Sequence, residues 1–291
     1  MSKFTITNDG LRELPDDTRD FSLGGVFGFT KIEDVPVTDF VVATPLVIKD
    51  QGDTDLCSSY TVTAVSEDQE NIELLPEYQF YSTKRISGDF SAWGANLRDA
   101  CKSATEYGSL PVSSFPHMKG QSRDYILKKE NWDPAADMIA KMYRKSTFFA
   151  VTGQYDLFDN IRCALWQHKE KKNTIVTGAL WKNGWIPAVR GIIPNIGGDG
   201  FGHAFKIFGQ KVIDGELFLV AQLSNGTQVG DNGLYYFSRE VANRELSKYG
   251  VYMFKDITRE EAEYYLSKPY TKNTDIFTKL LYIIRGFLMS K

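Results

Sequence analysis

The sequence is short of cysteine, of long apolar runs and of excess charge of either sign. It contains three cysteines, none in a C-x-x-C pair, so we expect neither a disulfide framework nor a zinc site. No stretch approaches the ~20 apolar residues of a transmembrane helix, and the N-terminus lacks the apolar run of a signal peptide. The net charge of −3 argues against a general nucleic-acid binder, which is usually basic. These absences favour a reducing, intracellular origin.

What is present describes a globular chain with a helical first half and a strand-rich second half. Hydrophobic residues make up 42% and charged residues 24% of the sequence, as is usual for proteins with a buried core. Apolar residues recur at helical spacing over about 58–74, 77–86 and 96–107, whereas β-rich runs and Gly-containing turns dominate after residue 146. This order predicts an α+β fold with a cleft between its halves.

The same distribution of helical, β-rich and turn-like patterns divides the chain into four segments. Residues 1–45 are expected to be loop-like and to wrap the fold, residues 46–145 to form a helical subdomain, and residues 146–255 to form a β-rich, barrel-like subdomain. Residues 256–291 are expected to form a helical tail, which is the most apolar stretch outside the core. Three roles stay open for the tail: packing on the domain, docking to a partner or a second copy, and contact with a membrane surface, of which the last is the least favoured.

A candidate nucleophile lies in the first half. A polar, Gly-containing turn over residues 51–56 leads into Cys57, and an apolar-periodic segment follows, which places the thiol in the first turn of a helix. Helix N-termini carry free N–H groups and a partial positive charge. A thiol there ionises more easily, and the thiolate is the nucleophilic form. Gln51, six residues upstream, can bring an amide donor back to the same point.

A candidate base lies in the second half. His203 opens a predicted strand, so a cleft between the two halves can bring its imidazole to Cys57. The remaining cysteines, Cys101 and Cys163, lie on apolar helix faces and are expected to be core residues.

Several stretches resemble the sequence motifs of one enzyme family and occur in the same order along the chain. They are residues 15–21 (PDDTRDF), Gln51-Gly52 with Cys57, 75–81 (LPEYQFY), 94–100 (GANLRDA), 202–204 (GHA) and 224–233 (SNGTQVGDNG). Over roughly residues 12–240 the chain thereby resembles the papain-like cysteine peptidases, in particular their bacterial and viral members. The spacing of Cys57 and His203, 203 − 57 = 146 residues, lies in the range of about 130–150 known for papain-like enzymes.

This resemblance implies a papain-like fold without a cofactor, and acyl transfer from a peptide bond through a thioester on Cys57. His203 would be the general base and acid, and the Gln51 side chain would form the oxyanion hole with the Cys57 N–H. Asn225 would hold the imidazole as the third catalytic residue. An ungapped alignment instead puts the asparagine of the family at Leu223, and both positions face the same side of a strand.

The chain also departs from the family pattern. Ser58 replaces the tryptophan after the nucleophile, Thr54 replaces a structural cysteine, and Asn225 and Val229 stand where the family has tryptophan. Three functions therefore stay open. The leading one is a cytoplasmic or virion-associated thiol peptidase acting on a peptide or protein substrate. The second is a catalytically degenerate papain-like domain with a structural or binding role in a larger viral or bacterial assembly. The third is a transglutaminase-like or amidase acyl transfer.

Overall fold

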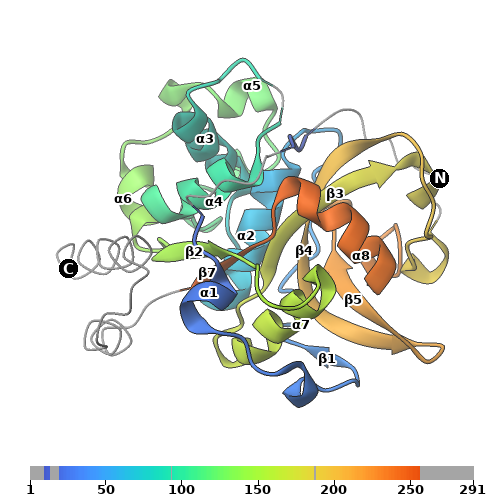
Figure 1. The fold of residues 1–291 in the computed structure, drawn as a ribbon. Helices are drawn as coiled ribbons and strands as arrows, with labels where there is room; N and C mark the ends of the chain where they lie inside the picture. The colour runs from blue at the N-terminus through green and yellow to red at the C-terminus, as the bar shows by residue number, and fades with distance from the viewer. Residues whose placement is uncertain (1–9, 14–19, 93, 187, 256–291) are drawn as a thin grey trace, which may run out of the picture.

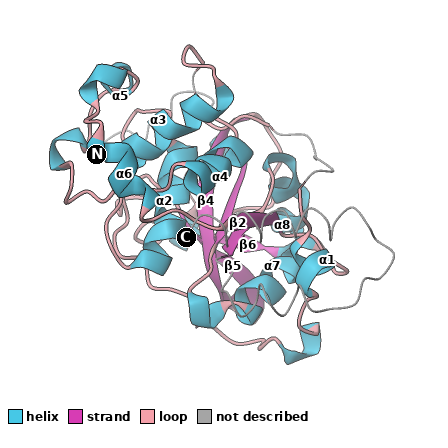
Figure 2. Ribbon diagram, turned by 90° about the vertical axis from the view of Figure 1, so that its left-hand side faces the viewer, coloured by secondary structure: helices cyan, strands magenta, loops and turns pink. Residues whose placement is uncertain are grey.

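The structure, a computed structural model, describes residues 10–13, 20–92, 94–186 and 188–255. A group of helices lies beside a β-sheet, and α2 (Cys57–Glu70) runs at the junction of the two (Figure 1). Seen from the side, α3 to α6 lie on one side of the strands, and α1, α7 and α8 lie on the other (Figure 2). The predicted α+β class is confirmed.

The helices predicted for the first half are present. The α-helices in the described residues are α1 (Leu23–Phe27), α2 (Cys57–Glu70), α3 (Pro76–Ser87), α4 (Leu97–Glu106), α5 (Arg123–Ile126), α6 (Ala135–Lys141), α7 (Leu157–Gln167) and α8 (Arg239–Glu245). α2 ends earlier than the pattern predicted because Asn71 adopts the left-handed conformation, with φ at 56°, and its N–H closes the last turn on Glu67 O.

One helix lies where the sequence predicted an irregular chain, so that prediction was wrong. The short helix α1 begins at Ser22, whose hydroxyl accepts a hydrogen bond from the N–H of Gly25 at 3.0 Å. Gly24 is required by packing, because a Cβ there would lie 2.7 Å from Thr152 O.

In the described part of the chain, seven strands form one sheet. They are β1 (Phe40–Val41), β2 (Thr147–Ala150), β3 (Ile175–Lys182), β4 (Gly200–Ile213), β5 (Glu216–Gln222), β6 (Leu234–Ser238) and β7 (Tyr252–Lys255). Their order is β2-β7-β3-β4-β5-β6, β1 pairs with β4, and every pairing is antiparallel. The hairpin between β4 and β5 turns at Asp214 and Gly215, which both have positive φ as a type I′ turn requires.

The apolar core divides in the same way as the layers. One large cluster, including Phe205 and Phe237, lies on the α7 and α8 side of the sheet, and another, including Tyr78, lies among the helices. A third cluster joins the two halves and contains Cys57 and Ala204. The candidate nucleophile therefore lies in the seam between the helices and the sheet.

Buried ion pairs tie α2 to the sheet and so fix the position of its N-terminus. Asp68 and Lys206 of β4 pair at 2.8 Å, and both side chains are almost fully buried. Glu67 pairs with Lys49, which lies just before the turn that leads into Cys57. Burial raises the pKa of both carboxyls, against the lowering effect of the lysines. Removing one partner of such a pair costs about 3–5 kcal/mol.

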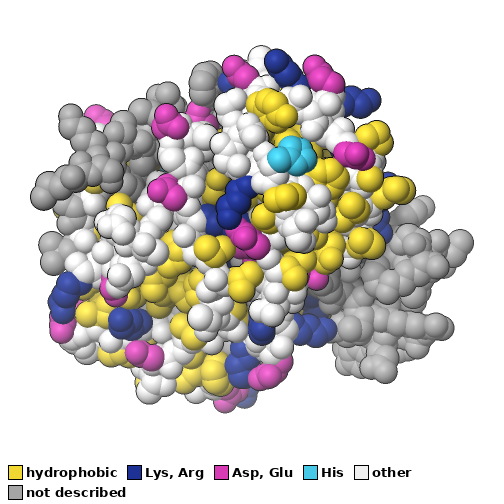
Figure 3. Space-filling model, turned by 180° about the vertical axis from the view of Figure 1, so that it is seen from behind, with side chains coloured by type: hydrophobic (Ala, Val, Ile, Leu, Met, Phe, Trp, Pro, Cys, Tyr) yellow, Lys and Arg dark blue, Asp and Glu magenta, His cyan; other side chains and the backbone are white. Residues whose placement is uncertain are grey.

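Three expectations from the sequence concern the surface charge, membrane-spanning helices and the C-terminal tail. On the face seen in Figure 3, Lys and Arg side chains are interspersed with Asp and Glu rather than gathered into a patch of one sign. In the ranges given above, no helix is long and apolar enough to cross a membrane. The helical tail predicted at 256–291 lies outside the described residues, and the division into four segments stays a prediction.

Candidate active site

The nucleophile turn is held by its own side chains. Asp50 Oδ1 accepts from the N–H of Gly52 at 2.9 Å, and the Thr54 hydroxyl donates to Gln51 O at 2.7 Å. Gly52 has a φ of +60°, which glycine adopts without strain. The turn delivers Cys57 as the first residue of α2, as the sequence predicted.

The Cys57 thiol is enclosed rather than exposed. It is 1% exposed, and burial raises its pKa to about 12 against backbone hydrogen bonds from Ala204 and Ser58. Cys57 and Ala204 pack in one buried cluster, and because Ala204 directly follows His203 on β4, the thiol lies next to the strand that carries the imidazole. Among the described residues no hydrogen bond joins Cys57 Sγ to the His203 ring.

The imidazole is oriented by an amide and by aromatic rings. His203 Nε2 lies 2.9 Å from Asn225 Oδ1, so Nε2 carries the proton in this contact. The ring of Trp181, from the neighbouring strand β3, lies edge-on at 5.9 Å between centroids, and the Phe201 ring lies at 6.4 Å. Burial lowers the pKa of His203 to about 4, although the hydrogen bond to Asn225 raises it.

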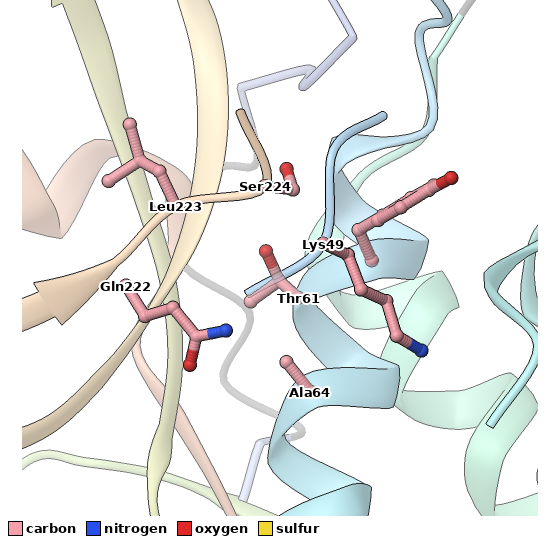
Figure 4. Close-up of a pocket in the computed structure, with 7 residues that line it drawn as sticks. Lys49, Thr61, Ala64, Gln222, Leu223 and Ser224 are labelled. Atoms are coloured by element: carbon pink, nitrogen blue, oxygen red, sulfur yellow. The ribbon is translucent and has the colours of Figure 1, made fainter. Parts of the chain in front are cut away.

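Leu223 and Asn225 lie in different surroundings in the structure. Leu223 is 1% exposed and belongs to the large apolar cluster of the sheet. In the small cavity behind the site, Leu223 points toward the sheet, whereas Gln222 points toward α2 (Figure 4). Asn225 pairs with Asp50 in an isolated antiparallel bridge, which carries its side chain to His203.

Gln51 lies beside the nucleophile turn, but its amide already has partners. Its Nε2 donates to Thr54 O at 2.6 Å, and its Oε1 accepts from the Ser224 hydroxyl at 2.5 Å. The N–H of Gln51 also donates to Ser224 O at 2.8 Å. Ser224, which the sequence analysis did not single out, therefore fixes the Gln51 side chain from the residue next to Asn225.

The N-terminal segment fills the space above the thiol. A Cβ on Gly10 would lie 3.0 Å from Cys57 Sγ, and the N–H of Leu11 donates to Gly202 O at 3.2 Å. On the other side, Ala95 N–H donates to Gly10 O at 3.1 Å, and Arg12 N–H donates to Ala95 O at 3.3 Å. We refer to residues 10–12 as the covering segment.

The Leu11 side chain enters the seam between the two halves. It is 2% exposed and shares a cluster with Cys57, Val176 and Ala204. The glycine before the histidine has a steric reason, since a Cβ at Gly202 would lie 2.0 Å from Leu11 O. The seam between the two halves therefore holds a main-chain segment with an apolar side chain next to Cys57.

With residues 10–12 in this position, the Cys57 thiol and the His203 imidazole are both neutral at pH 7. The pKa of the thiol lies near 12 and that of the imidazole near 4, both displaced by loss of water. A thiolate–imidazolium pair forms only when the pKa of the thiol lies below that of the imidazole. Water or a polar substrate that enters the cleft favours the charged forms of both groups.

The other cysteines take no part in the site. Cys101 and Cys163 are both unpaired and fully buried, as predicted for core residues. In the described part of the chain, no group of three or more His, Cys, Asp or Glu side chains is arranged to hold a metal ion.

Comparison with known proteins supports the fold. No protein-family model matches the chain, and a search of curated proteins finds no match. Among solved structures, xylellain, a cysteine protease from Xylella fastidiosa, is 18% identical with a TM-score of 0.69, over 87% of this chain and 98% of xylellain. Procathepsin B S9 from Trypanosoma congolense is 14% identical with a TM-score of 0.62, over 85% of each chain.

A third similar structure covers the cysteine protease and lectin-like domains of Cwp84, a surface layer associated protein of Clostridium difficile. It is 13% identical with a TM-score of 0.60, over 88% of this chain and 57% of that structure. These likenesses show that the chain has the papain-like fold, as the motifs implied.

Proposed function

We propose that this protein is a papain-like cysteine peptidase with Cys57 as nucleophile. The observation that carries the proposal is the contact of 2.9 Å between His203 Nε2 and Asn225 Oδ1, on a histidine whose neighbour Ala204 packs in the same buried cluster as Cys57. A helix N-terminus, an imidazole and an orienting amide are the groups that thiol acyl transfer needs.

Each step of the reaction has a group in the site. With Nε2 engaged by Asn225, Nδ1 of His203 is the nitrogen left to accept the thiol proton. The thiolate attacks the carbonyl carbon of the scissile peptide. The Cys57 N–H and the second Nε2–H of Gln51, the one that is not donated to Thr54 O, stabilise the oxyanion. The imidazolium then protonates the leaving amine, and water hydrolyses the thioester with His203 acting as base.

The covering segment indicates what such a substrate would look like. A substrate chain that replaces residues 10–12 would pair with Ala95 and Gly202, as the covering segment does. Its side chain in the place of Leu11 would lie against Val176 and over Gly178, where an added Cβ would come within 2.2 Å of Leu11 Cδ2. We therefore propose a preference for a branched aliphatic side chain at that position.

Covalent labelling tests the proposal. An epoxide or vinyl-sulfone probe should modify Cys57, and Cys57→Ala should abolish the adduct while Cys163→Ala leaves it unchanged. Because Cys163 is buried in α7, it serves as the matched control for loss of a thiol. Folded protein that is never labelled at Cys57, even after prolonged incubation, would contradict the peptidase assignment.

The second candidate is a degenerate papain-like domain with a binding role. It is favoured by the filled cleft and by the neutral state of Cys57 and His203. We propose residues 256–291 as its contact region with a protein partner or a second copy, in a viral or bacterial assembly. An inert protein that loses self-association or partner binding when 256–291 are removed, as seen by size-exclusion chromatography, supports this candidate.

Transfer to an amine instead of water uses the same thioester. Comparing release of a peptide product with incorporation of a labelled primary amine separates peptidase from transglutaminase-like activity. Hydrolysis without amine incorporation is the outcome that the peptidase proposal predicts.

A further inference from the structure

A buried lysine lies beneath one wall of the cleft. Lys84 of α3 is 2% exposed, and its Nζ donates to Ala92 O at 2.8 Å and to Gly94 O. Its ammonium also lies 5.1 Å from the centre of the Phe80 ring. Among the described residues Lys84 forms no ion pair, so a buried positive charge is neutralised by main-chain carbonyls and a ring.

The carbonyls that Lys84 binds belong to the loop that supports the covering segment. We call residues 89–95 the ledge loop; Trp93 within it lies outside the described residues. The ledge loop ends at Ala95, whose N–H and C=O hydrogen-bond the covering segment. Two carbonyls three residues or fewer before Ala95 are thus turned inward onto one ammonium.

A second cation holds the outer part of the ledge loop. Arg123 of α5 donates through Nη2 to Ser91 O at 3.0 Å and to Ala92 O at 3.2 Å. Asp89 Oδ1 accepts from the N–H groups of Ser91 and Ala92 at 3.2 and 3.0 Å. Arg123 and Asp89 hold the ledge loop near the surface. Lys84 holds it at Gly94, the residue next to Ala95.

A buried ammonium without a carboxylate partner is costly, and its desolvation is offset only in part by hydrogen bonds to carbonyls. A methionine has a similar length and would fill the same space without a charge. This cost of burying the ammonium is explained if the carbonyls of Ala92 and Gly94, which bind Lys84, fix the direction of the N–H and C=O groups of Ala95.

We propose that Lys84 is a positioning residue that holds the ledge loop so that Ala95 pairs with the main chain of the substrate. The proposal rests on the proposed function, because it takes the site of the covering segment to be the substrate cleft. Lys84 touches no reacting atom, so its effect is on binding and not on the acyl-transfer step.

The charge state of Lys84 gives the proposal a pH signature. Burial lowers the pKa of Lys84 to about 8, with Arg12 and Arg123 lowering it further and Asp89 and Asp99 raising it. Above that pH the amine is neutral and its hydrogen bonds to carbonyls weaken. The hold on Ala95 should therefore loosen as the pH rises through about 8.

The first test needs no catalysis. Amide hydrogen exchange on the full-length chain, corrected for the intrinsic pH effect, reports the protection of the Ala95 N–H. Lys84→Met should lower that protection about tenfold, the size expected for loss of a charged hydrogen bond, and Lys84→Arg should retain it. Arg85→Met is the matched control, since Arg85 is the next residue of α3 but pairs with Asp137 instead of the ledge loop.

The second test measures KM and kcat for peptide hydrolysis in the Leu11→Ala background, where the covering segment competes less with substrate. Lys84→Met should raise KM about tenfold and leave kcat within about twofold. With Lys84 intact, KM should rise above pH 8, and Lys84→Arg should remove this rise. Unchanged Ala95 protection and unchanged KM in Lys84→Met would overturn the proposal.

The outcomes separate this proposal from the proposed function. If the protein hydrolyses no peptide, the peptidase assignment fails, and hydrogen exchange still decides the role of Lys84. If Lys84→Met does not fold, the pH dependence of Ala95 protection in the unaltered chain decides it, and protection that is flat from pH 7 to pH 9.5 refutes the role.

Discussion

Shortening Leu11 to alanine should expose the Cys57 thiol without altering Cys57, His203 or Asn225. The Leu11 side chain is 2% exposed and packs in the cluster that contains Cys57 and Ala204. Replacing a buried leucine by alanine costs about 2–5 kcal/mol. Here the loss falls on the docked state of the covering segment. At about 3 kcal/mol, the fraction of molecules with a detached segment rises about 100-fold.

The rate at which a vinyl-sulfone probe modifies Cys57, followed by intact mass, measures this fraction when detachment limits labelling. The rate should rise about 100-fold in Leu11→Ala, or until the detached state predominates. Leu165→Ala is the matched control, because it removes the same side chain from a fully buried position in α7, away from the cleft. A Leu11→Ala rate equal to that of the control would refute the idea that the covering segment shields the thiol.

Two further predictions concern stability. Asp68→Asn should lower the free energy of unfolding by about 3–5 kcal/mol, because Lys206 is left charged and unpaired in the interior; urea unfolding measures the loss, and a change below about 1 kcal/mol would contradict it. The free energy of unfolding should also fall as the pH drops from about 6.5 to about 4, because the unfolded His203 binds a proton that the buried ring does not. His203→Gln should flatten this slope, and an equally steep slope in that variant would count against a buried neutral imidazole.

Much of the site could be predicted because its signals are local. Cys57 follows a Gly-containing turn and begins an apolar-periodic segment, so its place at the start of α2 is written within about ten residues. His203 likewise sits in an apolar run with a glycine before it, which predicts a strand. The chemistry of each residue type then suggested their pairing.

What the sequence did not show depends on contacts between distant segments. The position of residues 10–12 over Cys57 depends on pairing with Ala95 and Gly202, and nothing in the local pattern marks it. The choice of Asn225 over Leu223 needed the side chains around them, because a shift of two residues keeps the same strand face.

The helix α1 and the role of Lys84 were missed for a related reason. Glycines suggested a loop, whereas close packing against Thr152 makes Gly24 compatible with a helical turn. A lysine in an amphipathic helix is normally solvated, and only the folded chain shows that Lys84 lies beneath the ledge loop.

The assignment of Cys57 as the nucleophile is tested most directly by trapping the acyl-enzyme. Leu11→Ala protein is incubated with a peptide ester that carries leucine near the scissile bond, quenched in acid, and mapped by mass spectrometry. We expect an acyl adduct on the peptide that contains Cys57. We expect no adduct in the Leu11→Ala, His203→Ala double variant. Folded protein with no adduct, or with the adduct on another residue, would contradict the assignment of Cys57 as the nucleophile.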